Sequence, residues 1–154
     1  MEYAKQKLLI EQLNKKLLPF RHLENTIVPQ KGWIHTIRTT LKMSLRQLGN
    51  RLKISAQSVK EIEDRESSGS ITIKTLKEAG KALDMRLVYG FIPKNKSIEQ
   101  MIEQRAFEIA SDIVMRTSGT MKLEDQENSK ERLDKAIKNR AEEIKNKMPR
   151  YLWD

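Results

Sequence analysis

The sequence predicts a mainly α-helical protein, with helical extensions on either side of a central domain and one short strand. Three observations lead to this fold class. Of the 154 residues, 38% are hydrophobic and 33% are charged, which favours a thin, surface-rich helical protein over a thick sandwich or barrel. Apolar residues recur at helical spacing through most of the chain. Serines stand directly before several of these stretches, where helix N-caps are expected.

The same patterns divide the chain into three segments. Residues 1–31 are expected to hold a helix over 2–18, which Pro19 ends, and a linker. Residues 32–93 form the central domain. Residues 94–154 form a C-terminal helical region for dimerisation or partner binding.

Short helices fill the first half of the central domain. The first of them covers residues 33–42. Ser44 then caps a second helix, and Gln47 completes a capping box. After a turn of about three residues, Ser55 caps another helix, which continues to about Arg65.

A further helix and a strand complete the central domain. Residues 67–70 predict a loop, and a helix starts at Thr72 or Ile73 and ends at Asp84. Residues 86–92 are β-branched and aromatic, so we expect a strand there. A lone strand needs a partner for its backbone groups, and the same strand of a second copy would provide one. The alternative is a short, buried extended segment.

The C-terminal region predicts two long helices. Ser97 caps the first, which runs to about Thr117, and the second covers about 124–147. Trp33 and Trp153 are expected to anchor a core or a seam between helices. Apolar residues along the last helix form a narrow seam suited to one facing helix. These seam residues are Leu133, Ile137, Ala141, Ile144 and Met148.

Positive charge is concentrated in the first two thirds of the chain. The net charge is +9, and residues 94–154 contribute only +1, from thirteen basic and twelve acidic residues. Residues 32–60 hold six basic residues and no acidic one. A block of one sign favours a surface that binds phosphates, and the alternative is a solvated, lysine-rich face.

Residues 44–66 carry the most informative pattern. Two short Ser-capped helices around a tight turn are typical of a helix-turn-helix, whose second helix lies in the DNA major groove. Gly49 costs about 1 kcal/mol of helix propensity relative to Ala, and close approach of the second helix would explain it. Gln57 can pair with adenine, and Glu61 can accept a hydrogen bond from cytosine. The candidate DNA-binding residues are Arg46, Gln47, Ser55, Ala56, Gln57, Ser58, Lys60 and Glu61.

Catalysis, metal binding and membrane insertion are not expected. His22 and His35 lie in different segments without metal-ligand spacing, and there is no phosphate-binding glycine loop or nucleophile elbow. The absence of cysteine excludes disulfide and thiolate chemistry. No stretch approaches the roughly 18–20 apolar residues of a membrane span, and the N-terminus lacks the apolar core of a signal peptide. We therefore expect a cytoplasmic protein without cofactor that is not an enzyme.

The helix-turn-helix stretch LKMSLRQLGNRLKISAQSVKEIEDRE resembles the core of XRE-type (Cro/C1-like) regulators. A narrower resemblance covers nearly the whole chain, through GWIHTIRTTLKMSLRQLGNRL, SITIKTLKEAGKALDMRLVYGFIP, TMKLEDQ and YLWD in this order. These segments resemble the family called mobile mystery protein A, XRE-type regulators often encoded beside a Fic-domain protein on mobile elements. The resemblance implies DNA binding and an antitoxin-like pairing.

The sequence departs from the general XRE pattern at three positions. Lys53 stands where a turn glycine is common, Leu45 where a phosphate-contacting Gln is frequent, and Ala56 where polar base-contacting residues are common. The resemblance also implies that Arg38 pairs with Glu63, and we therefore expect both to be structural.

Two functions follow as expectations. The first is a sequence-specific, homodimeric regulator of transcription, an autorepressor, which places the helix at 55–66 in the major groove of double-stranded DNA. The alternative is an antitoxin-like module that binds a Fic-domain partner, which the balanced charge and apolar seam of the last third favour. Thr120 to Glu124 have the spacing of a helix motif in Fic antitoxins, but Asp125 follows instead of Gly or Asn. The start of the last helix is the alternative interpretation there.

Overall fold

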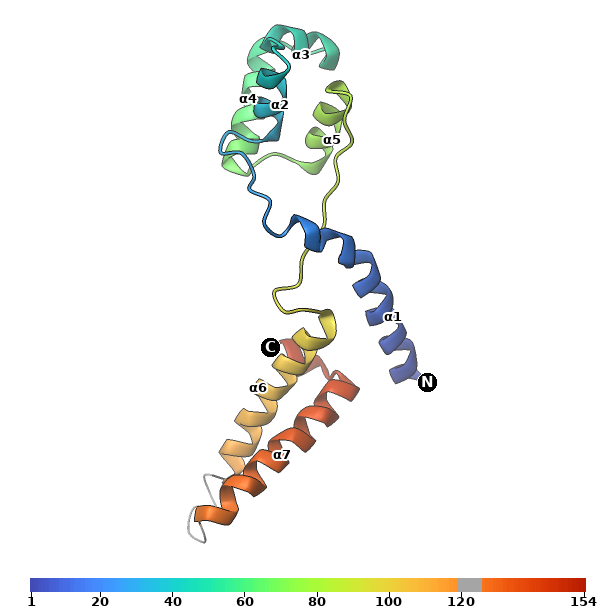
Figure 1. Ribbon diagram of the computed structural model, residues 1–154, viewed down its shortest axis with the longest axis vertical. Helices are drawn as coiled ribbons and strands as arrows, with labels where there is room; N and C mark the ends of the chain where they lie inside the picture. Colours follow the sequence, from blue (N-terminus) through green and yellow to red (C-terminus); the bar gives the residue numbers. More distant parts are fainter. Residues whose placement is uncertain (119–125) are drawn as a thin grey trace. The chain divides into compact units, whose positions relative to one another are not determined.

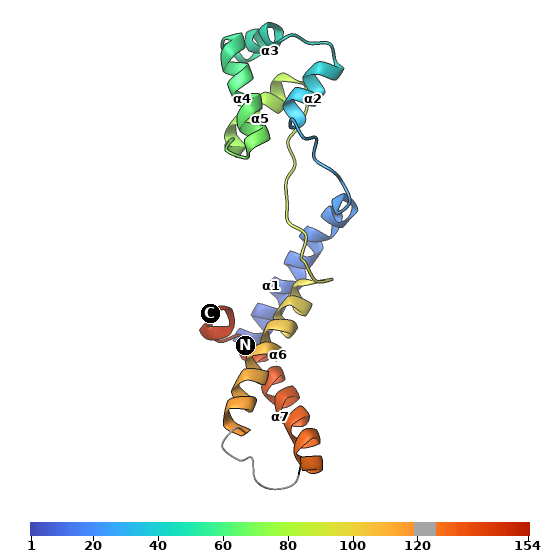
Figure 2. The same ribbon diagram turned by 90° about the vertical axis from the view of Figure 1, so that its left-hand side faces the viewer.

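The computed structural model describes residues 1–118 and 126–154, and seven α-helices account for most of them. The chain forms two compact units (Figures 1 and 2). One unit holds residues 23–90. The other joins residues 1–22 to residues 91–154, so the N-terminal helix belongs with the C-terminal helices. The mainly α-helical class predicted from the sequence is confirmed.

Four helices build the unit of residues 23–90. They are α2 (Trp33–Thr40), α3 (Leu45–Leu52), α4 (Ala56–Ser68) and α5 (Ile73–Ala82). Each helix has one apolar stripe, and the stripes meet in a common core. The buried core residues are Ile34, Leu48, Val59, Ala79 and Leu83.

Hydroxyl side chains begin three of these helices, as the sequence predicts. The Ser44 Oγ accepts from the Gln47 N–H at 3.0 Å, and the Gln47 Oε1 accepts from the Ser44 N–H at 2.8 Å, which completes the capping box. The Ser55 Oγ accepts from the N–H of Ser58 at 3.1 Å. Thr72 caps α5 in the same way. These caps satisfy backbone donors that a helix leaves unpaired at its start.

Residues in the left-handed region end the same helices. Lys42, Lys53 and Asp84 have φ values of 55°, 58° and 57°, and Gly69 has a φ of 83°. Only Gly69 adopts this conformation without the steric cost of a Cβ. The predicted end of α4 near Arg65 is therefore wrong, because the helix continues through Ser67 and Ser68 to the conformational stop at Gly69.

The predicted strand at residues 86–92 is not formed in the part of the chain that the structure describes. These residues have no regular secondary structure, and Val88, Tyr89 and Phe91 are exposed rather than buried. The physical reason is that β-branched and aromatic residues become a strand only where a neighbouring strand supplies hydrogen bonds. The described residues offer no such neighbour.

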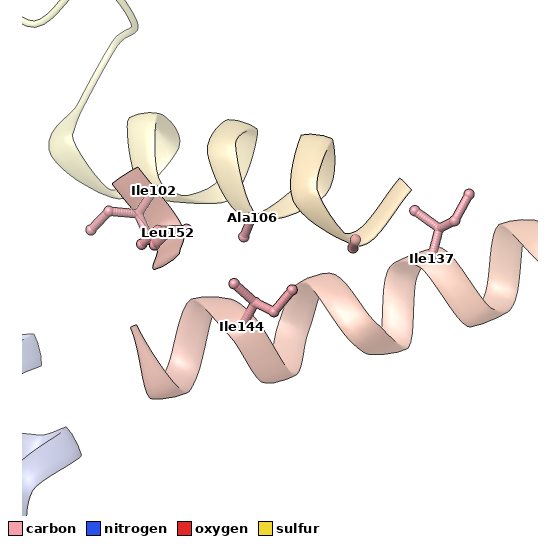
Figure 3. Packing of buried hydrophobic residues seen from close by; sticks show 6 residues of the cluster. Ile102, Ala106, Ile137, Ile144 and Leu152 are labelled. Carbon is pink, nitrogen blue, oxygen red and sulfur yellow. The ribbon is translucent and has the colours of Figure 1, made fainter. Parts of the chain in front are cut away.

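The second unit is built on two long antiparallel helices, α6 (Ile98–Ser118) and α7 (Gln126–Lys147). The predicted apolar seam of α7 packs against α6 (Figure 3), so this prediction is confirmed. Lys145 of α7 also pairs with Glu103 of α6 at 2.8 Å, which raises the pKa of the Lys145 ammonium. The buried core residues are Ile102, Ala106, Ala110, Ile137, Ile144 and Leu152.

The N-terminal helix α1 (Glu2–Leu17) lies on the edge of this unit. The Asn14 Oδ1 accepts a hydrogen bond of 3.0 Å from the N–H of Ile98, at the first residue of α6. Ile10 packs against the core, but no residue of α1 is buried. A 3-10 helix, Leu18–Leu23, follows α1. No helix within the described ranges is long and apolar enough to span a bilayer.

The tryptophans do not anchor a core, so this prediction is wrong. Trp33 is 42% exposed and Trp153 is 57% exposed. In the 3-10 helix Arg150–Trp153, the inward residue is Leu152, which is fully buried. The Arg105 Nε donates to the Leu152 carbonyl at 2.7 Å and fixes this orientation. A short helix of this kind buries one side only, and the aromatic residues on either side of Leu152 remain exposed.

Candidate nucleic-acid interface

The chain makes a tight turn between α3 and α4. A Cβ added at Gly49 would lie 2.7 Å from the Ile54 carbonyl oxygen, and the N–H of Ile54 donates to the Gly49 carbonyl at 2.9 Å. Only a residue without a side chain allows this approach, so the predicted reason for Gly49 is confirmed. Lys53 makes the turn in the left-handed conformation, at the position where the sequence comparison anticipated a strained backbone.

A buried ion pair fixes the inner face of α4. The Arg38 Nε donates to the Glu63 Oε1 at 2.5 Å, and the Arg38 Nη1 donates to the Met43 carbonyl at 2.8 Å. Glu63 is 2% exposed, and the Nδ1 of His35 lies 3.2 Å from its other oxygen. The predicted Arg38–Glu63 pair is thus present. Its role is to hold α2 against α4.

Glu66 has a structural role that the sequence did not reveal. Its carboxylate accepts two hydrogen bonds of 2.8 Å, from the N–H groups of Trp33 and Ile34 at the start of α2. Gly32 makes room for it, because a Cβ there would lie 2.7 Å from the Glu66 Cδ. The contact joins residues 33 positions apart, so no local spacing indicates it. It gives α2 an N-terminal cap from another helix.

The outward face of α4 presents polar side chains. Gln57, Lys60 and Glu61 are exposed, on the side of the helix opposite the buried Val59 and Glu63. Two intrahelical ion pairs cross this face, Lys60–Asp64 at 2.9 Å and Glu61–Arg65 at 3.6 Å. Exposed pairs of this kind contribute only about 0.3–0.5 kcal/mol, so they break readily in favour of another partner.

The other predicted interface residues surround the start of α4. Arg46, Gln47 and Ser55 are exposed, whereas Ala56 and Ser58 are partly buried. The Oε1 of Gln47 and the Oγ of Ser55 are each engaged in a helix cap. Their local role is therefore structural, and the exposed face of α4 offers the freer side chains.

The basic residues of 32–60 divide into two groups. Arg38 is buried, and Arg51 donates to the Ala82 carbonyl at 3.0 Å and pairs with Asp84 at 3.3 Å. Within the described ranges, Arg46 has no carboxylate within ion-pair distance, and the same holds for the exposed side chains of Lys42 and Lys53. These three cations lie on and beside α3, and they give this surface an unbalanced positive charge.

No family model, curated protein or solved structure matches this chain. The chemistry of the surface is therefore judged from its own residues. Among the described residues, no three His, Cys, Asp or Glu side chains are grouped to hold a metal ion. The arrangement offers amide and carboxylate groups at the exposed face of one helix, next to uncompensated cations. Such groups suit hydrogen bonding to base edges and charge pairing with phosphates.

Proposed function

We propose that this protein is a sequence-specific DNA-binding regulator of transcription, and an autorepressor, that acts in the cytoplasm as a homodimer. In this proposal α3, the turn and α4 work as an XRE-type helix-turn-helix, with α4 in the major groove. The observation that carries it is the division of α4 into two faces. Val59 and Glu63 fix the helix on the core, while Gln57, Lys60 and Glu61 remain exposed. A rigid helix with a polar outer face is what major-groove readout needs.

The proposed contacts follow from the chemistry of each group. Gln57 offers a donor and an acceptor to adenine, and Glu61 accepts from the cytosine amino group. Arg46 is placed to contact a phosphate, because its charge is unpaired among the described residues. The N-terminus of α4, begun by Ser55, adds backbone donors and a favourable dipole for a second phosphate.

Two copies of the chain are needed to read a palindromic site. Two recognition helices about 34 Å apart would enter successive major grooves on one side of the duplex. This geometry predicts that the operator is palindromic, with its half-sites centred about one helical turn apart.

Salt dependence of DNA binding by the full chain tests this proposal. We expect log Kd to change steeply with log salt, because each neutralised phosphate contributes a slope of about 0.9. Arg46→Ala is expected to weaken binding to all sequences alike and to lower the slope by about one. Arg132→Ala, which removes an exposed arginine on α7, is the matched control and is expected to bind like the wild type. A slope near zero would contradict the proposal.

The antitoxin-like alternative receives no specific support from these contacts. The apolar seam of α7, which favoured it, is filled by α6 of the same chain. The motif from Thr120 to Glu124 lies outside the described residues. Binding to a Fic-domain protein therefore remains a secondary proposal, which pull-down with the full chain would test.

A further inference from the structure

Residues 86–92 form a segment whose sequence favours a strand but whose backbone has no partner. No hydrogen bond involves a backbone N–H or C=O of these residues among those the structure describes. Val88, Tyr89 and Phe91 are 64%, 58% and 81% exposed. In Figure 1 the segment follows α5 as a chain without helical coiling. Open backbone groups flanked by exposed apolar side chains are the features of an unpaired edge strand.

We infer that two copies of the protein pair through residues 86–92, as an antiparallel two-stranded ribbon centred on Tyr89. This inference rests on the proposed function in one respect only, because it assigns the contact of the homodimer that the operator requires. A second copy is the natural partner, because a two-fold axis through the centre of an antiparallel pair makes the segment complementary to itself. Each chain then satisfies the open hydrogen-bonding groups of the other.

The register follows from the side chains. With Tyr89 opposite Tyr89, Leu87 faces Phe91, and Arg86 faces Ile92, so no charge faces a like charge. The same register brings Asp84, just before the segment, toward Lys94 of the other copy. Centring the ribbon on Gly90 instead would place Arg86 opposite Lys94, which is a repulsive pair. The Tyr89 register is therefore favoured by charge as well as by apolar matching.

The beginning of the segment is held against α5. A Cβ added at Gly80 would lie 3.5 Å from the Met85 carbonyl oxygen and 3.8 Å from the Leu87 nitrogen, so the chain passes directly over this helix. Further along, the Lys77 ammonium lies 5.9 Å from the centre of the Tyr89 ring, at cation–π distance. A ribbon formed here would be attached to the unit that carries α4. It would thus couple two recognition helices.

Cysteine crosslinking tests the register directly, because the natural chain has no cysteine. Opposite residues of an antiparallel pair have Cα atoms about 4.5–5.5 Å apart, within the range of a disulfide. We expect the full-length Tyr89→Cys variant to form a dimer on mild oxidation that a reductant reverses. Ser70→Cys is the control for an exposed position in the same unit, and Val88→Cys is the control for register. Crosslinking of Tyr89→Cys no faster than Ser70→Cys would overturn the inference.

Sedimentation equilibrium without DNA provides a second readout. We expect the wild-type chain to dimerise and Val88→Pro to weaken the dimer at least tenfold, because proline removes a backbone donor from the ribbon. Far-UV circular dichroism checks that the helices of the variant are intact. A monomeric wild type, or an unchanged dimer in a folded Val88→Pro variant, would overturn the inference. Neither result would affect DNA selection by the wild type, so failure of the ribbon is distinguishable from failure of the proposed function.

Discussion

Arg38 of α2 and Glu63 of α4 form an ion pair whose side chains are only 10% and 2% exposed. The pair lies beneath the outward face of α4, so the position of that face depends on it. A second arginine donor, Nη2, lies 3.2 Å from the other carboxylate oxygen, which makes the contact two-pronged. Because both groups are buried, neither can be removed without leaving the other uncompensated.

Arg38→Ala is expected to destabilise the unit of residues 23–90. Removing one partner of a buried pair costs about 3–5 kcal/mol, which lowers the melting temperature of a unit of this size by more than about 10 °C. Thermal unfolding followed by circular dichroism measures this change. Arg46→Ala, at an exposed arginine of the same unit, is the control and is expected to melt within about 2 °C of the wild type. Equal melting temperatures for the two variants would refute the structural role of Arg38.

The two helical glycines are expected to respond to alanine in opposite directions. At Gly49 a Cβ would lie 2.7 Å from a backbone oxygen that cannot move freely, so Gly49→Ala should cost about 1–3 kcal/mol. At Gly80 the nearest atom is 3.5 Å away, an ordinary contact, so Gly80→Ala should stabilise by about 0.5–1 kcal/mol through helix propensity. Urea unfolding of both variants gives the comparison. If both substitutions stabilise, the close turn after α3 is not as described.

Lys53→Gly is expected to stabilise the turn between α3 and α4. A non-glycine residue at a φ of 58° carries a steric cost, and its relief offsets the added entropy of the unfolded chain. The expected gain in the free energy of unfolding is up to about 1 kcal/mol. Lys53→Ala also removes the charge but keeps a Cβ, so it should not show this gain. Chemical denaturation of the two variants separates backbone from charge effects, and equal stabilities would count against backbone strain.

Glu66→Ala is expected to loosen the start of α2. The substitution removes the acceptor of two backbone N–H groups, and losing a helix cap typically costs about 1–2 kcal/mol. Hydrogen exchange at the amides of Trp33 and Ile34 should accelerate. Glu61→Ala, an exposed glutamate of the same helix, serves as the control and should leave both amides unchanged. Unchanged exchange in Glu66→Ala would show that the carboxylate does not cap α2.

Local patterns predicted the parts of the fold that depend on local chemistry. The capping box at Ser44 and Gln47 lies within four residues, and the left-handed turn at Lys53 follows from its position after a helix. The seam of α7 repeats at helical spacing, so its packing against one facing helix was also predictable. In each case a few neighbouring residues contain the whole signal.

Contacts between distant residues were not predictable from one sequence. Glu66 reaches α2 across 33 positions, and Asn14 reaches α6 across 84. The exposed Trp33 shows that large apolar residues are not always internal, since much of any protein surface is apolar. Residues 86–92 have strand composition, but composition does not supply the neighbouring strand that would complete it.

Base preference is expected to depend on Gln57 and Glu61. Replacing both by Ala removes the groups proposed to contact adenine and cytosine, at a cost of about 1–3 kcal/mol of discrimination per contact. Fluorescence anisotropy with the preferred site and single-base variants measures this loss. The double variant Gln12→Ala, Glu131→Ala, which removes exposed residues of the same types on other helices, is the control. It should keep the wild-type preference.

Selection of bound DNA from a random pool by the full-length protein tests the central claim most directly. The account predicts enrichment of a palindromic sequence with half-sites centred about 10–10.5 base pairs apart, or a multiple of this spacing. It also predicts that Gln57→Ala with Glu61→Ala selects a less specific sequence. A pool with no enriched sequence, or the same enriched sequence for wild type and double variant, would contradict the assignment of α4 as the recognition helix.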